Sequence, residues 1–128
     1  MKRDSSLLLQ QMQDAAMRAV QYVDGMNLQT FLKDTRTQEA VSLNLLIIGE
    51  IAGTLVRDHA DIVAAMPQLP LRNMQAMRNR IAHGYFAMNM NIVWDTVDVA
   101  LPDLVRHLES IRNLGVEGSS ASNPGTIA

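Results

Sequence analysis

The sequence predicts an all-α domain built from four to five helices. Hydrophobic residues make up 48% of the chain but aromatic residues only 4%, so aliphatic side chains and nine Met must fill the interior. This composition favours helices, because strands depend more on aromatic and β-branched side chains. In several segments apolar side chains also recur three and four residues apart, the period of an amphipathic helix. With 128 residues the chain has the size of one domain.

The first helix is expected from about Ser5 to Asp24, with Asp4 or Ser5 as its N-cap and Gly25 at its end. Five of its apolar residues recur at helical spacing and form one stripe: Leu8, Met12, Ala15, Ala19 and Val23. A single stripe is typical of a helix that packs against a core on one side. Residues 27–31 are expected to form a turn or a single helical turn, which Phe31 anchors in the core.

The second helix is expected from Thr35 or Thr37 to Ile62 and is apolar on more than one face. Its predicted core stripe is Ala40, Leu43, Ile47, Ile51 and Leu55, while Leu45, Leu46 and Ile48 point elsewhere. Such a helix needs more than one partner surface, so we expect it to lie in a dimer interface as well. Gly49 and Gly53 would permit a close helix–helix approach there. The alternative is a central helix buried within its own monomer.

Proline and glycine residues divide the rest of the chain. Pro67 and Pro70 bracket a loop, and a third helix is expected from Leu71 to Ile81 or Ala82, with Gly84 as its terminator. A short helix is expected from Ile92 to Val97. The last helix is expected from Pro102 to about Asn113. The helical domain is therefore predicted over residues 1–114, and residues 115–128, rich in Gly, Ser, Asn and Pro, are predicted to be a disordered tail.

The formal net charge is −2, but the charges are unevenly distributed. No Asp or Glu occurs between Ile62 and Trp94, a segment that contains Arg72, Arg78, Arg80 and His83. A mildly acidic chain thus carries one locally positive segment, which favours contact with a phosphate backbone. The alternative is chance clustering of charge on a solvated helix face.

Several classes of site are excluded by the residues present. There is no cysteine, so disulfides and thiolate metal sites are excluded. No group of His, Asp and Glu has the spacing of metal ligands, and no cofactor is expected. Glycine-rich phosphate loops and serine-nucleophile motifs are missing as well. The apolar runs are too short for a signal peptide or a membrane span, so we expect a cytoplasmic protein that does not associate with membranes.

The segment Arg78 to Tyr85 holds the residues needed for RNA cleavage without a metal ion. Asn79 and His83 are four residues apart and share a helix face, and Gly84 loosens the helix end so that His83 can swing toward Arg78. A neutral histidine can take the proton from a ribose 2′-hydroxyl, and an arginine can hold the phosphate oxygens as charge builds on them. We assign Arg78 and His83 as catalytic residues. The plainer alternative is that the helix macrodipole favours cations near its C-terminus.

The other residues of this segment have expected supporting roles. Asn79 would orient the imidazole or the phosphate, and Arg80 adds a further cation. Tyr85 emerges just past the helix end and could stack on a base or hydrogen-bond near the scissile group. DNA would not be cleaved, because it lacks the 2′-hydroxyl that acts as the nucleophile.

Three blocks of sequence resemble one known family in order and spacing. RNRIAHGYFAMNMNIVWDTV, which begins at Arg78 and carries the pattern Arg-x4-His-x-Tyr, is similar to the signature of HepT-type toxins of the HEPN superfamily. FLKDTRTQEAVSLNLLIIGEIA resembles the second-helix block of that family, and ALPDLVRHLESI resembles its C-terminal block. Leu71 and Ala76 depart from the residues usual in the family, and both positions look structural.

The resemblance implies an antiparallel helical bundle that forms a homodimer with its two motifs facing one cleft. It implies a metal-independent endoribonuclease that acts as the toxin of a type VII-like toxin–antitoxin system, with Arg78 and His83 catalytic. It also implies a cognate antitoxin, a minimal nucleotidyltransferase of the MNT type. This antitoxin would use Mg²⁺ and ATP to transfer AMP onto Tyr85.

Two other functions are compatible with the sequence. In one, the chain is a non-catalytic helical subunit that binds a nucleotidyltransferase and its nucleotide or substrate, and Arg78 serves only in binding. The overall negative charge favours this alternative. In the other, the chain is a purely structural dimerisation domain.

Overall fold

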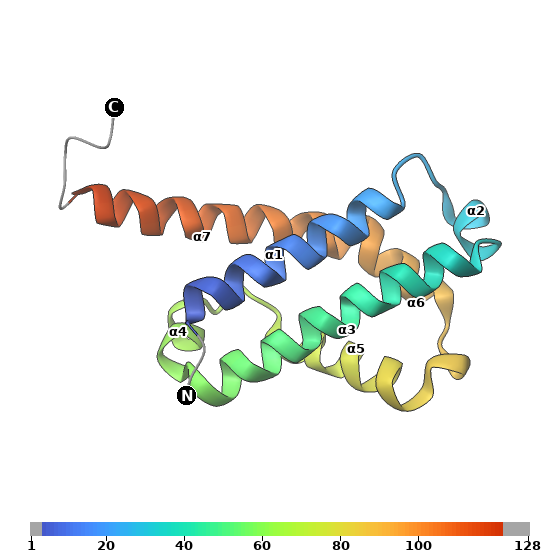
Figure 1. Cartoon of the computed structure of the whole chain (residues 1–128), viewed down its shortest axis with the longest axis horizontal. Coiled ribbons are helices and arrows are strands. Elements are labelled where there is room, and N and C mark those ends of the chain that lie inside the picture. The colour runs from blue at the N-terminus through green and yellow to red at the C-terminus, as the bar shows by residue number, and fades with distance from the viewer. Residues whose placement is uncertain (1–3, 122–128) are drawn as a thin grey trace.

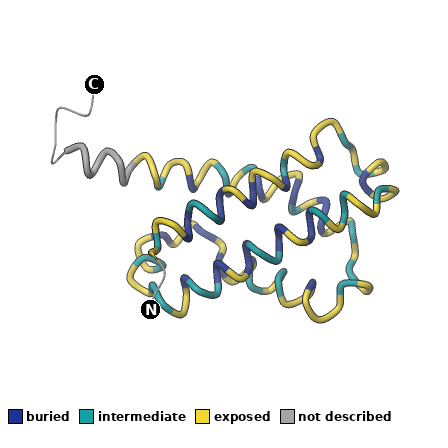
Figure 2. Tube along the Cα trace, viewed as in Figure 1, coloured by how far each residue is buried: buried dark blue, intermediate teal, exposed yellow. Residues whose placement is uncertain are grey.

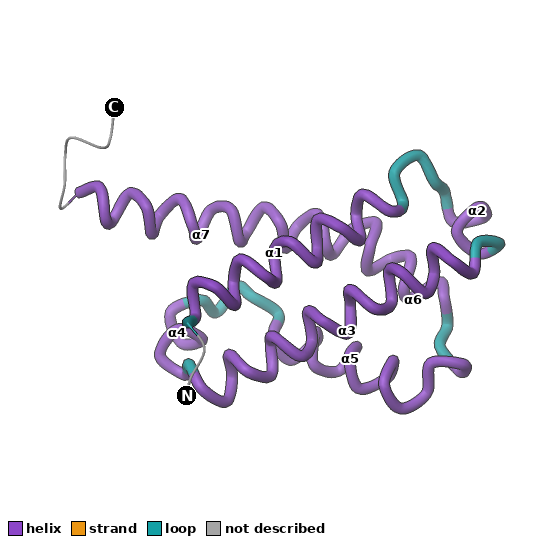
Figure 3. Tube along the Cα trace, in the orientation of Figure 1, coloured by secondary structure: helices purple, strands orange, loops and turns teal. Residues whose placement is uncertain are grey.

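The structure is a computed structural model that describes residues 4–121, and the side chains of residues 4–113. Within these residues the chain is helical and contains no strand (Figure 3). The long helices are α1 (Ser5–Tyr22), α3 (Thr35–Asp58), α5 (Leu71–Gly84) and α7 (Leu101–Ala121). The short ones are α2 (Leu28–Leu32), α4 (Ala60–Ala65), the 3-10 turn η1 (Tyr85–Ala87), α6 (Met90–Asp95) and the π-helical segment η2 (Thr96–Ala100).

The four long helices alternate in direction, which confirms the predicted all-α antiparallel bundle (Figure 1). α3 lies between α1 and α5 and packs along both, and α1 packs on its other side against α7. Figure 2 shows buried positions recurring along α1 and α3 with exposed positions between them. The core is therefore built by the sides of these helices that face one another.

The N-terminal third of the chain agrees closely with its prediction. Asp4 caps α1 by accepting a hydrogen bond from the Ser6 amide at 2.9 Å, and all five residues of the predicted apolar stripe are buried. Gly25 follows the helix with a φ of +76°, a conformation that favours glycine. Phe31 on α2 is fully buried, and its ring lies 5.3 Å from that of Trp94 on α6.

The predicted core stripe of α3 is only partly right: Ile51 and Leu55 are buried, but Ala40 and Ile47 are half-buried. The side that faces the core carries Val41, Leu45, Ile48, Ala52 and Leu55, all of them buried. In contrast, Leu43 of the predicted stripe is 57% exposed. The helix also ends at Asp58 instead of continuing to Ile62, because His59 has a non-helical backbone and separates α3 from α4.

The glycines of α3 pack within the monomer. A Cβ atom added at Gly49 would lie 2.2 Å from the Arg78 Cβ and 2.6 Å from the Met74 carbonyl oxygen, both on α5. Gly53 is less tightly enclosed, since its added Cβ would lie 3.4 Å from the side-chain nitrogen of Gln75. The close approach predicted for a dimer interface is therefore found, at Gly49, between α3 and α5 of one chain.

The first residues of α3 are held by a side-chain cap. The Asp34 carboxylate accepts hydrogen bonds from the Thr37 hydroxyl at 2.7 Å and from the Thr37 amide at 3.0 Å. These bonds lower the pKa of Asp34 below its ordinary value, because they stabilise the ionised carboxylate. The cap fixes where α3 starts.

The C-terminal region differs from its prediction mainly in the last helix. The predicted short helix over residues 92–97 corresponds to α6 and the start of η2. The last helix begins at Leu101, one residue before the predicted Pro102, and runs to Ala121, past the predicted end at Asn113. Residues 122–128 of the predicted tail lie outside the described residues, and the domain boundary at residue 114 stays a prediction.

Among the described helices, α3 alone is long and apolar enough to cross a membrane by length and composition. Its most apolar window has a mean hydropathy of 1.5, and half of that window is buried inside the bundle. The central helix of a soluble bundle has the same two properties, since it also packs on more than one side.

We predict that Gly49→Ala destabilises the fold whereas Gly53→Ala does not. The new methyl group at residue 49 would overlap the backbone and Cβ of α5, so the two helices must move apart, at a cost of about 1–3 kcal/mol. At residue 53 the neighbour is a flexible side chain at ordinary contact distance, and Ala is the better helix former by up to about 1 kcal/mol. Urea unfolding followed by circular dichroism measures both, and equal effects of the two variants would contradict the packing described.

Candidate functional site

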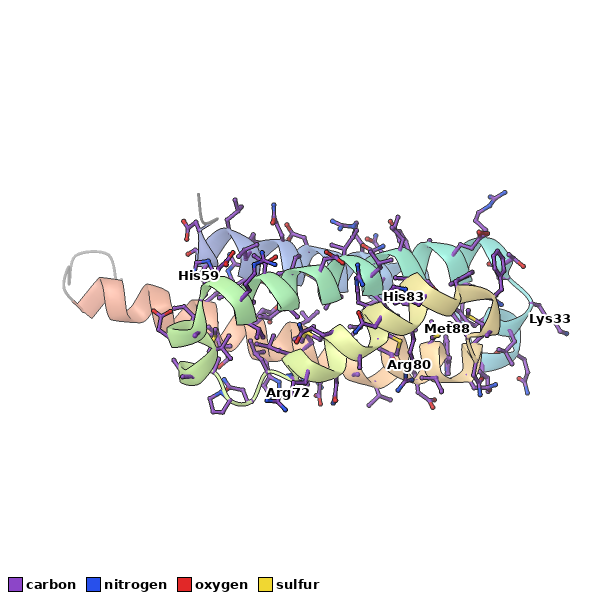
Figure 4. The ribbon with its side chains drawn as sticks, turned by 90° about the horizontal axis from the view of Figure 1, so that it is seen from below. Lys33, His59, Arg72, Arg80, His83 and Met88 are labelled. Carbon is purple, nitrogen blue, oxygen red and sulfur yellow. The ribbon has the colours of Figure 1, made fainter. Side chains whose placement is uncertain are left out.

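The candidate site lies on the second half of α5 and on the segment that follows. Arg78, Asn79, Arg80 and His83 all belong to α5. The helix runs to Gly84, past the predicted end at Ile81 or Ala82, so His83 lies inside it. Gly84 does not end the helix through a left-handed conformation, because its φ is −161°. Figure 4 labels Arg80, His83 and Met88 around this end of α5, and Arg72 near its start.

The Arg78 guanidinium is held by two side chains. Its Nε pairs with the Glu50 carboxylate on α3, and its Nη1 donates to Asn79 Oδ1 at 3.1 Å. The Arg78 side chain is 33% exposed and Glu50 53% exposed, so the pair is open to solvent on one side. Both contacts fix the direction of the guanidinium and leave its other N–H groups free to bind an anion.

Glu50 is the site residue that the sequence did not reveal as a partner of Arg78. It lies 28 residues before Arg78 and directly after Gly49, the point at which α3 and α5 approach most closely. Gly49 was the feature of the sequence that could have indicated this partner. A glycine inside a helix indicates a close helix contact, and the next residue, here Glu50, then lies at the edge of that contact.

Arg78 and His83 line different hollows in the monomer. The first, of about 190 Å³, lies between α3 and α5 and is lined by Gly49, Glu50, Gly53, Thr54, Arg57, Gln75, Arg78 and Asn79. The second, of about 440 Å³, lies at the end of α5 and is lined by Arg80, His83, Gly84, Ala87, Met88, Asn89 and Ile92. Five residues turn about 140° around a helix axis, which accounts for the separation.

The swing of His83 toward Arg78 that the sequence suggested is not seen, since His83 lies within α5. The imidazole is exposed, and no residue in the described part of the chain hydrogen-bonds to it or pairs with it. It is therefore free to accept a proton or to contact a ligand. Asn79 accepts a hydrogen bond from Arg78, a contact that the sequence did not predict, and it makes no hydrogen bond to the imidazole.

Tyr85 is less exposed than the sequence suggested. It is half-buried and packs against the hydrophobic core, and its ring meets that of Phe86 edge-on with centroids 5.8 Å apart. Phe86, the next residue, is fully exposed. The two rings occupy η1, directly after the last turn of α5.

The described residues contain no group of three or more His, Asp or Glu side chains that could hold a metal ion. The candidate site comprises a fixed cation with its carboxylate partner, an unpaired imidazole, an amide and a phenol. These groups can bind a phosphate, move a proton and accept a modification.

Comparisons with known proteins identify the family of this chain. A family model described as ribonuclease HepT-like matches residues 12–111. A protein of Methanocaldococcus jannaschii named "Putative RNase MJ0127" is 31% identical over 110 residues, covering 86% of this chain and 88% of the relative. A protein of Thermococcus cleftensis named "Probable ribonuclease HepT" is 30% identical over 112 residues, covering 88% of this chain and 99% of the relative. No solved structure matches the chain significantly.

The family match spans α1 from Met12, the whole of α3 and α5, and α7 as far as Ile111. It includes every residue of the candidate site, Glu50 among them. The resemblance noted in the sequence is thereby confirmed, and the chain belongs to the HepT-like ribonuclease family.

Proposed function

We propose that this chain is the toxin of a type VII-like toxin–antitoxin system and cleaves RNA without a metal ion, using Arg78 and His83. The observation that carries the proposal is the fixed Arg78 guanidinium, held by Glu50 and Asn79 and partly open to solvent. A preorganised cation of this kind stabilises charge that develops on a phosphate. The protein would act in the cytoplasm.

In the proposed reaction His83 accepts the proton of a ribose 2′-hydroxyl, and the 2′-oxygen forms a bond to phosphorus. The bond from phosphorus to the 5′-oxygen breaks, and the 5′-oxygen takes a proton from solvent. The products are a 2′,3′-cyclic phosphate and a 5′-hydroxyl. The free N–H groups of Arg78 bind the non-bridging oxygens, on which negative charge builds in the transition state.

A homodimer would explain how Arg78 and His83 act on one phosphate although they line separate hollows of the monomer. If the ends of two α5 helices meet, Arg78 of one protomer can lie near the partner's His83. The exposed side of α3 offers an apolar surface for such contact, since Leu43 is 57% exposed and Leu46 and Ile47 are half-buried.

We further propose that a cognate MNT-type nucleotidyltransferase neutralises the toxin by transferring AMP to Tyr85. The phenol oxygen would attack the α-phosphorus of ATP, pyrophosphate would leave, and the phenol proton would pass to solvent. Tyr85 lies two residues beyond His83 and is half-buried, so part of its ring is accessible. The added phosphate would place negative charge and bulk where the RNA phosphate must bind.

We expect Arg78→Ala and His83→Ala each to lower RNA cleavage by at least about a hundredfold, because one removes the charge stabiliser and the other the proton acceptor. Arg72→Ala is the matched control, since Arg72 is an exposed cation at the other end of α5 and should be dispensable. Cleavage is followed on a labelled RNA with purified protein, and growth arrest on induction reports the same effect in cells.

The alternative function, a non-catalytic subunit that binds a nucleotidyltransferase and its nucleotide or substrate, is favoured by the formal net charge of −2. It predicts no RNA cleavage even at high protein concentration. Full activity of both Arg78→Ala and His83→Ala would show instead that the cleavage site lies elsewhere.

For Glu50 we expect Glu50→Ala to lower kcat by about tenfold to a hundredfold, because the guanidinium loses its support and small displacements at a catalytic group are costly. The affinity for RNA should not fall, since the substitution removes a negative charge. Glu50→Gln keeps an acceptor for Arg78 Nε and should retain most of the activity. A positioning role is contradicted if Gln and Ala reduce kcat equally, or if only KM changes.

Co-expression with the cognate nucleotidyltransferase should add the mass of one or more AMP units to the peptide that contains Tyr85, measured by mass spectrometry. Tyr85→Phe removes only the phenol oxygen and should stay unmodified, so that this variant escapes covalent inactivation. An unmodified Tyr85 peptide from a fully neutralised complex would show that the antitoxin acts by binding alone.

A further inference from the structure

Phe86 is more exposed than any other large hydrophobic residue described. Its relative exposure is 102%, whereas the next most exposed, Val99, is at 64%. The backbone that carries the ring is held in η1, where the Met88 amide donates to the Tyr85 carbonyl at 3.0 Å, and the ring meets that of Tyr85 edge-on. An uncovered aromatic ring on an ordered backbone is a platform on which a flat ligand can stack.

The hollow at the end of α5 is lined by Gly84 and Ala87, which flank the segment that carries Phe86, and by both apolar groups and hydrogen-bond donors. The apolar part is formed by Ala87, Met88 and Ile92, and the polar part by Arg80, His83 and Asn89. No carboxylate is among the described residues that line it. Its volume of about 440 Å³ lies in the range of small-molecule sites, which is ample for a nucleobase.

Asn89 offers a donor of fixed direction to this hollow. As the N-cap of α6, its Oδ1 accepts from the Asn91 amide at 2.9 Å and from the Asn91 side chain at 3.0 Å. The oxygen is thereby used, and the Nδ2 group is the part of the Asn89 amide that remains to donate to a ligand. Every nucleobase carries ring or carbonyl acceptors that such a donor can bind.

We propose that this hollow and Phe86 form a nucleobase subsite for single-stranded RNA. One unpaired base lies in the hollow against Met88 and Ile92 and accepts a hydrogen bond from Asn89, and a neighbouring base stacks on Phe86. His83 lines the same hollow, so the subsite sets which ribose 2′-hydroxyl reaches the imidazole. The absence of acidic residues from the lining and the presence of Arg80 fit an anionic strand. The inference rests on the proposed ribonuclease function and adds to it where the substrate bases bind.

The test is binding of short single-stranded DNA oligonucleotides, which lack the 2′-hydroxyl and therefore cannot be cleaved by the proposed reaction. Fluorescence anisotropy gives the dissociation constant for the wild type and for each variant, and an oligonucleotide of abasic residues is the ligand control. We expect the wild type to bind the base-containing strand more tightly than the abasic strand, since stacking needs a base.

Phe86→Ala should weaken binding by about fivefold to a hundredfold, the range expected for one stacked base. Phe86→Trp should keep the affinity, and the fluorescence of the introduced indole should be quenched by the base-containing strand only. Phe86→Leu keeps an apolar side chain but loses the aromatic face, and should bind as weakly as Phe86→Ala. Leu7→Ala, which shortens a half-exposed apolar side chain on the first turn of α1, should bind like the wild type.

Asn89→Asp tests the hydrogen-bond donor that Asn89 offers to the hollow. Aspartate caps a helix as well as asparagine does, so α6 should be preserved, while the Nδ2 donor is replaced by a negatively charged oxygen. Binding should weaken by at least about tenfold, because a donor is lost and a like charge now faces the strand.

Several results would overturn the subsite: no binding by the wild type, equal binding of base-containing and abasic strands, or unchanged binding by both Phe86→Ala and Asn89→Asp. A change in oligomeric state on Phe86→Ala, measured by sedimentation, would also overturn it and would make Phe86 a protein-contact residue.

The nucleobase subsite and the proposed catalysis can fail independently. If the wild type binds as expected but cleaves no RNA, the proposed catalysis fails and the subsite stands. If the wild type cleaves RNA while the variants bind normally, only the subsite fails.

Discussion

The candidate site depends on the close approach of α3 and α5 at Gly49. Any side chain at that position would meet the Arg78 Cβ at 2.2 Å and the Met74 carbonyl oxygen at 2.6 Å, so the two helices can lie this close only because Gly49 has none. Glu50 is the next residue along α3, and the approach brings its carboxylate to the Arg78 guanidinium. One packing constraint in the core thus sets both the position of the arginine and the identity of its partner.

The Glu50–Arg78 pair lowers the positive charge at the site but orders the Arg78 side chain. A carboxylate at this point weakens the positive field that attracts RNA, which counts against its presence in a phosphate-binding site. However, a free arginine side chain samples many rotamers, and ordering it in the transition state would cost entropy. Glu50 and Asn79 order the guanidinium beforehand, and because the pair is partly open to solvent, water and salt screen its charge. The neighbouring residues offset the negative charge of Glu50, since Arg80 and His83 lie nearby on α5 and residues 62–94 contain no Asp or Glu.

How well each element could be predicted follows from how its apolar residues are arranged. α1 has one apolar stripe, and that stripe is the buried side. α3 is apolar nearly all round, so its apolar pattern does not predict which side faces the core. Two other residues decide that orientation: Gly49, which allows the close contact with α5, and Asn44, which is buried with its hydrogen bonds satisfied. Asn44 accepts from Arg18 Nε at 3.0 Å and donates to the Ala40 carbonyl at 2.9 Å, an arrangement visible only once α1 and α3 are paired.

The candidate site shows the same limit. Arg78 and His83 could be proposed from their local motif, but Glu50 could not, because its role depends on a contact between residues 28 positions apart.

The five-residue spacing of Arg78 and His83 has a physical consequence for any reaction at this site. On a continuous helix the two side chains point about 140° apart, and α5 remains helical through both residues. One chain therefore presents its fixed cation beside α3 and its imidazole beside the segment after α5. A phosphate can contact both only if α5 unwinds at its end or if a second copy supplies one of the two. Unwinding would separate Tyr85 and Met88 from the core against which they pack. This cost is the physical reason to propose a dimer, with the substrate bound between two α5 ends.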